Sequence, residues 1–128
     1  MKEGLVDTVK EVTIKDLLNM TSGIPYPDES FEAGIQMGKL YKNIKDKLEK
    51  GQPTSTLDYC NQIGQSPLAF QPGEAWLNGA SADILGAVIE IVSGKKFSQF
   101  LKDEIFLLLL NPVVQVLYLL LMIIVNLP

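Results

Sequence analysis

The chain has 128 residues, a net formal charge of −4 and a pI near 4.7. This length suits a single domain, and an acidic chain without a basic stripe excludes a nucleic-acid-binding surface. The absence of histidine removes the commonest general base and most zinc sites, and a lone cysteine, Cys60, excludes an internal disulfide. We therefore expect no metal, no cofactor and no nucleic-acid partner.

Capping residues and helical periodicity predict the first two helices. Thr13 and Asp16 have the spacing of a capping box, which opens a short helix over residues 14–20. Apolar residues then recur every three or four positions across residues 31–50. This pattern predicts an amphipathic helix that ends at Gly51.

Three more helices are predicted after residue 53. Thr54 or Ser55 is expected to cap a short helix that reaches residue 63, and Ser81 is expected to be the N-cap of a helix that ends at Gly94. The apolar stripe of that helix comprises Ile84, Leu85, Val88, Ile89 and Val92. A last amphipathic helix is expected over residues 97–105, and no run alternates with period two. The sequence up to residue 104 therefore predicts a mainly α fold.

Two segments carry the clearest motifs. They read VTIKDLLNMTSGIPY (residues 12–26) and PLAFQPGEAWLNGASADILGAVIEIVSGKKFSQFLKDEIF (residues 67–106). In this order they resemble the serine β-lactamase-like hydrolases, which include class C β-lactamases, D-Ala-D-Ala carboxypeptidases and related penicillin-binding-protein-like esterases. The resemblance implies that residues 1–106 are part of a β-lactamase-related domain, namely the helical subdomain of an α+β fold.

The same resemblance implies a parent activity, the acyl-transfer hydrolysis of a lactam, a D-Ala peptide or an ester through a serine nucleophile. Such a serine needs a neighbouring base and an oxyanion hole. The family supplies the serine and a lysine in a Ser-x-x-Lys motif, which we expect to lie before the first residue of this chain. A third motif, Lys-x-Gly or His-x-Gly, is expected to lie beyond its last residue. The one literal match, Ser93-Gly94-Lys95-Lys96, crosses a predicted helix end, so we interpret it as structural.

The family's motif tyrosine aligns with Asn78, in the remnant motif Asn78-Gly79-Ala80-Ser81. An amide neither ionises near neutral pH nor carries a phenolic proton, so it cannot replace the tyrosine. We interpret Asn78 as a loop residue that tolerates a positive φ beside Gly79. No catalytic residue set is therefore complete in this chain, and we expect a fragment or pseudoenzyme that is not active alone.

Several other side chains in the two segments are interpreted as structural. Ser22 is expected to hydrogen-bond within its turn. Trp76 is expected to be a packing anchor under the active-site rim of the intact enzyme. Tyr26 and Tyr59 lie outside the motif position and are expected to pack with exposed hydroxyl groups.

The last segment, residues 107–128, forms a separate hydrophobic region, and no charged residue occurs after Glu104. A helix over residues 105–128 is about 36 Å long and could span a bilayer core of about 30 Å, although Pro112 weakens it. We favour a shifted reading frame as the origin of this segment. The alternative is a membrane-associated, non-catalytic protein that retains the scaffold, with membrane binding or self-association through residues 107–128. The first residues do not begin a signal peptide, so a cytoplasmic or membrane-associated location is expected.

Overall fold

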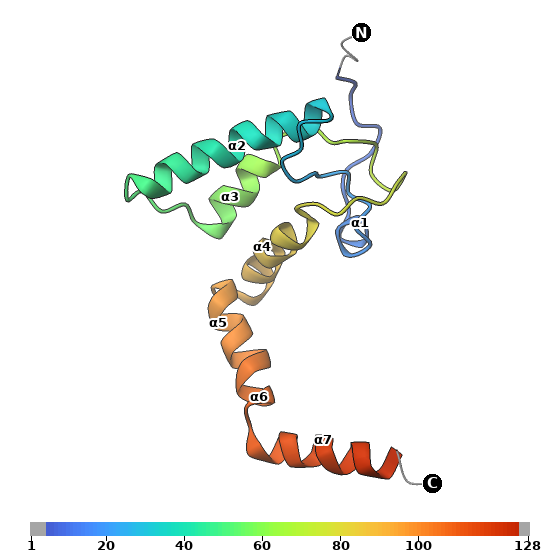
Figure 1. Cartoon of the computed structure of the whole chain (residues 1–128), viewed down its shortest axis with the longest axis vertical. Helices are drawn as coiled ribbons and strands as arrows, with labels where there is room; N and C mark the ends of the chain where they lie inside the picture. The colour runs from blue at the N-terminus through green and yellow to red at the C-terminus, as the bar shows by residue number, and fades with distance from the viewer. Residues whose placement is uncertain (1–4, 126–128) are drawn as a thin grey trace. The chain divides into compact units, whose positions relative to one another are not determined.

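The computed structural model describes residues 5–125, which are mainly helical and contain no β-strand (Figure 1). Contacts within the chain divide it into two compact units, residues 1–88 and residues 89–128. The division falls inside one helix and does not coincide with the predicted boundary at residue 107. That boundary stays a prediction.

The first unit contains three complete helices and the start of a fourth: α1 (Ile14–Leu18), α2 (Glu32–Glu49), α3 (Thr56–Ile63) and α4 (Ser81–Ser93). The capping box predicted at the start of α1 is confirmed, because the Thr13 side chain accepts from the Asp16 N–H and the Asp16 carboxylate accepts from the Thr13 N–H. Ser55 is the N-cap of α3, as one of the two predicted alternatives.

The ends of α1 and α2 show why the chain turns where it does. The predicted helix over residues 14–20 is two residues too long, since Met20 takes a φ of 57°. Gly51 follows α2 with a φ of 71°, which confirms the predicted glycine stop. A left-handed residue after the last turn redirects the backbone and ends the helix.

A small core joins these helices. Its buried members come from α1, the following turn, α2, α3 and the residue before α4, namely Leu17, Ile24, Met37, Ile63 and Ala80. Ile84 and Leu85, from the predicted stripe of α4, pack against them. Burying each large apolar side chain contributes roughly 1.5–3 kcal/mol, so a core of this size can stabilise only a small unit.

The second unit contains the end of α4 and then α5 (Phe97–Leu101), η1 (Lys102–Phe106), α6 (Leu107–Leu109) and α7 (Pro112–Val125). The single helix predicted over residues 97–105 is wrong in its detail, because η1 is a π-helix that joins α5 to α6. Gly94, with a φ of 66°, ends α4 as predicted. Val92, from the predicted apolar stripe, is 81% exposed.

The helices of the uncharged segment are short. α6 has three residues and α7 has fourteen, with Pro112 at the start of α7. Within residues 5–125, no helix combines the length and the apolar character needed to cross a membrane.

Candidate functional site

The turn after α1 brings the first motif segment against the second. The Thr21 N–H donates to the Asp16 carbonyl at 2.8 Å, which folds the chain back over the helix end. Gly23 then takes a φ of 77°, and a side chain there would meet the Phe70 carbonyl oxygen at 2.5 Å. Only glycine fits this combination of a left-handed backbone and close contact.

The remnant motif docks on this turn through its backbone. The Leu77 N–H donates to the Met20 carbonyl at 2.9 Å, and the Ala80 N–H donates to the Ile24 carbonyl at 3.2 Å. An isolated antiparallel bridge pairs Pro25 with Gly79. The two motif segments therefore share one backbone interface, in which the paired residues lie more than fifty positions apart in sequence.

Gly79 is required by this interface. A Cβ atom at this position would overlap the Ile24 carbonyl oxygen and would lie 3.1 Å from the Pro25 Cα. The neighbouring atoms belong to the backbone, which cannot move aside as a flexible side chain can. The glycine of the remnant motif therefore permits close backbone approach.

The hydroxyl groups of Ser22 and Ser81 meet in the interior of the first unit. Their oxygen atoms lie 2.7 Å apart, each residue is 1% exposed, and the Ser22 oxygen also accepts from the Ile24 N–H at 3.2 Å. The turn bond predicted for Ser22 is confirmed. Ser81 is the first residue of α4 and not the residue before it, so its predicted role as N-cap is wrong. Its hydroxyl joins the two motif segments instead.

Asn78 lies in the loop before α4, and its side chain is exposed. The positive φ that our interpretation allowed for this residue is not adopted. Among the described residues other than glycine, only Met20 has one. Trp76 is 68% exposed, so it is not a packing anchor in this chain. Asn78 and Trp76 therefore stand on the surface, whereas Gly79, Ala80 and Ser81 are buried beneath them.

Two tyrosine hydroxyl groups make specific contacts that the sequence did not indicate. Tyr59 donates to the Tyr41 hydroxyl at 2.6 Å, and the rings meet edge to face with centroids 6.0 Å apart. Burial, followed by the bond to Tyr41, raises the pKa of Tyr59 well above its usual value. Tyr26 donates to the Asp83 carboxylate at 3.0 Å, and partial burial is the main cause that raises the pKa of Tyr26. The exposed hydroxyl predicted for Tyr59 is thus wrong.

The capping carboxylate of α1 also has a shifted pKa. The Thr13 hydroxyl donates to Asp16 Oδ2 at 2.6 Å, and the Thr13 N–H donates to the same atom at 3.0 Å. These two bonds favour the ionised carboxylate and lower the pKa of Asp16 below its usual 3.8. Asp16 is therefore a structural anion at the base of the motif turn.

The literal Ser-x-x-Lys match has the structural role predicted for it. Ser93 ends α4, Gly94 has a left-handed backbone, and the Lys95 N–H donates to the Ser93 hydroxyl at 3.2 Å. The Lys95 ammonium group lies 3.1 Å from Glu104 Oε1 and 3.3 Å from Asp103 Oδ2, and these bonds raise the pKa of Lys95. The lysine of the match, Lys96, is the N-cap residue of α5 and lies beyond the end of α4, so it does not share a helix face with Ser93.

No group of three or more histidine, cysteine, aspartate or glutamate side chains gathers within the described part of the chain. Cys60 is half-buried, and its thiol donates to the Asp83 carbonyl at 3.6 Å. The arrangement is therefore a well-packed frame around an exposed Asn78, with both motif serines turned inward.

Comparison with known proteins agrees with the motif segments. The sequence model of the Beta-lactamase family matches residues 5–112. The chain is also similar to the lovastatin esterase of Penicillium rubens, with 29% identity over 99 residues that make up 76% of this chain and 22% of that protein. The chain thus spans about a fifth of the length of this relative. The family match ends at the first residue of α7.

Proposed function

Because the chain belongs to the Beta-lactamase family, we propose that it is a fragment of a serine hydrolase scaffold that does not catalyse acyl transfer by itself. The parent reaction would be hydrolysis of a lactam, a D-Ala peptide or an ester, and the name of the esterase relative supports an ester substrate. The fragment retains the frame of the site without its reacting groups.

The observation that carries this proposal is the chemistry at position 78. An exposed amide stands where the family has its motif tyrosine, and an amide cannot shuttle a proton at neutral pH. The two motif serines do not compensate, because Ser22 and Ser81 are buried and bonded to each other. A buried hydroxyl cannot attack a substrate carbonyl.

Hydrolysis assays with nitrocefin and a p-nitrophenyl ester test the proposal. We expect the purified chain to show only the uncatalysed rate. Asn78→Tyr is expected to stay at the same rate, because a tyrosine alone cannot supply both a nucleophile and its base. Ser22→Ala and Ser81→Ala serve as controls. Turnover by the unmodified chain that a serine-directed inhibitor abolishes would overturn the proposal.

A second candidate function is a membrane-associated, non-catalytic protein that retains the scaffold. It is favoured by the exposed leucine and valine side chains of α6 and α7, from Leu107 to Leu120. Fractionation of cells that express the chain tests this candidate. Recovery with the membranes that depends on residues 107–128 supports it, and recovery in the aqueous fraction contradicts it.

A further inference from the structure

The apolar surface of the second unit is larger than a helix–helix contact needs. Its members in α6, in α7 and at Leu110 between them are between 50% and 69% exposed: Leu107, Leu108, Leu109, Leu110, Val113, Val116, Leu117, Leu119 and Leu120. At 100° per residue, the α7 members of this set spread over about 160° of the helix circumference. A coiled-coil seam is narrower than this. A face this wide is therefore better suited to contact with lipid hydrocarbon than to packing against one other helix.

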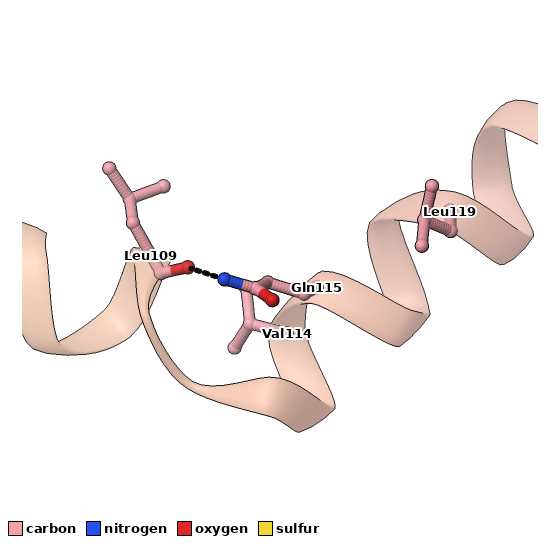
Figure 2. A pocket seen from close by; sticks show the side chains of 4 residues that line it. All are labelled: Leu109, Val114, Gln115 and Leu119. Atoms are coloured by element: carbon pink, nitrogen blue, oxygen red, sulfur yellow. Dashed lines mark hydrogen bonds between the residues drawn. The ribbon is translucent and has the colours of Figure 1, made fainter.

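Several backbone groups at the break between α6 and α7 are paired within the chain. The Val113 N–H donates to Asn111 Oδ1 at 2.9 Å, and the Gln115 side-chain amide donates to the Leu109 carbonyl at 3.1 Å (Figure 2). The Asn111 N–H donates to the Leu108 carbonyl at 3.2 Å, and Pro112 has no N–H to pair. The two polar side chains of this segment, those of Asn111 and Gln115, thus satisfy backbone groups that the helix break would otherwise leave free.

This pairing is more important in lipid hydrocarbon than in water. In water, free backbone groups at a helix end are hydrated at little cost, whereas in hydrocarbon each unpaired group costs several kcal/mol. An open hollow of about 400 Å³ lies beside the break, lined by Leu109, Val114, Gln115 and Leu119 (Figure 2). Three of its four lining side chains are apolar, so it offers a lipid chain contact and offers water few partners.

The net charge of the second unit indicates which lipid headgroups it would favour. Three lysines (Lys95, Lys96 and Lys102) are balanced by three carboxylates (Glu90, Asp103 and Glu104), and no charge follows. Lys95 is moreover held by Asp103 and Glu104. A neutral unit gains nothing from an anionic membrane surface.

We propose that α6 and α7 insert into the hydrocarbon of one leaflet of a bilayer, driven by apolar burial and independent of anionic headgroups. α7 is about 21 Å long at 1.5 Å per residue, which is shorter than the roughly 30 Å hydrocarbon core, so it enters the membrane without crossing it. The inference rests on the second proposed function and specifies how the membrane would be bound.

Flotation of the full chain with phosphatidylcholine vesicles tests this inference. We expect the chain to float, and to float no better when a third of the lipid is phosphatidylserine. Leu117→Asp places a charge on an α7 side chain that is 59% exposed, and it is expected to lower the partition coefficient about tenfold or more. Leu48→Asp, on a 53% exposed side chain of α2, is the matched control and is expected to float like the unmodified chain.

A second readout reports depth and guards against misfolding. In a Trp76→Phe background, Leu117→Trp is expected to give a blue-shifted emission that lipids brominated on their acyl chains quench. Failure to float, flotation only with phosphatidylserine, or an unquenched Trp at position 117 would overturn the inference. Oligomers that remain at the bottom of the gradient would indicate self-association and also overturn it. Cellular membrane recovery without flotation on pure lipid would leave the second proposed function standing and reject only this mode of binding.

Discussion

The hydroxyl oxygens of Ser22 and Ser81, which are 59 positions apart in sequence, lie 2.7 Å apart, and this contact joins the two motif segments. Both residues are buried, so neither hydroxyl can turn to water if its partner is removed. The pair therefore holds the motif turn against the start of α4.

Removal of one hydroxyl of this pair is expected to destabilise the first unit. Ser22→Ala and Ser81→Ala should each cost about 1–3 kcal/mol, because a buried hydroxyl is left without its partner. The double variant should cost less than the sum of the two. Urea unfolding of the full chain in mild detergent, followed by circular dichroism, measures these values. Additive costs would show that the two hydroxyls are not coupled.

A methyl group at Gly79 is expected to separate the two motif segments. Gly79→Ala would overlap the Ile24 carbonyl, and relief requires movement of two backbone segments. We expect a loss of roughly 2 kcal/mol or more in the free energy of unfolding. Gly64→Ala is the control, because Gly64 has a φ of −62° and ordinary contacts at 3.5 Å or more. An equal effect of the two substitutions would contradict the close approach.

Acid is expected to weaken the start of α1 through Asp16. The folded chain lowers the pKa of Asp16, so the carboxylate stabilises the fold above the usual pKa of 3.8. That contribution is lost as the pH falls through the lowered pKa. Unfolding midpoints should therefore differ between the unmodified chain and Asp16→Asn at neutral pH and converge once the pH falls below the lowered pKa of Asp16. Glu74→Gln, at an exposed loop residue, is the control, and its unfolding midpoint should not differ from that of the unmodified chain at neutral pH.

Alkaline pH is expected to act through Tyr59. Burial raises the pKa of Tyr59 in the folded chain, so the unfolded chain ionises first and stability falls as the pH rises above about 10. Tyr59→Phe should flatten this alkaline loss. Unfolding midpoints measured across the alkaline range check the slope, and a spectrophotometric titration should show one fewer late-ionising tyrosine. If stability fell equally steeply with pH in Tyr59→Phe, the alkaline loss of stability would come from another group.

The side chain of Gln115 allows a test of the paired helix break. Gln115→Met makes the segment more apolar but leaves the Leu109 carbonyl without its amide donor. If α6 and α7 enter hydrocarbon, the partition coefficient on phosphatidylcholine vesicles should fall several-fold despite the more apolar side chain. Gln36→Met, on the surface of α2, should leave it unchanged. Stronger partition of Gln115→Met would contradict internal pairing as the reason for insertion.

Local features of the fold were predictable from sequence, and long-range contacts were not. Thr13 and Gly94 were identified correctly, and Ser55 was one of two predicted caps, because helix caps depend on a few neighbouring residues. The bond between Tyr41 and Tyr59 depends on how α2 packs on α3, which periodicity does not specify. The π-helix within residues 97–105 was likewise missed, since its apolar spacing also fits an ordinary α-helix.

For the candidate site, too, the local motif was predictable from sequence and the long-range contacts were not. The resemblance located the remnant motif, but the roles of its residues came from three-dimensional partners. In sequence, Ser81 resembles an N-cap. Its actual partner, Ser22, lies far away along the chain, so the local sequence does not reveal the bond between them. Trp76 was expected to be a packing anchor in the intact enzyme, and its surroundings in this chain leave it exposed.

The bridge between Pro25 and Gly79 has a consequence for how such a chain could change over time. Position 78 is held by the main chain on either side of it and not by its own side chain, which points away from the core. The side chain at position 78 can thus be exchanged while the backbone hydrogen bonds of Leu77 and Ala80 and the bridge of Gly79 stay in place. The path of the main chain through this loop is set by its neighbours, and the chemistry of the side chain at position 78 is free to vary.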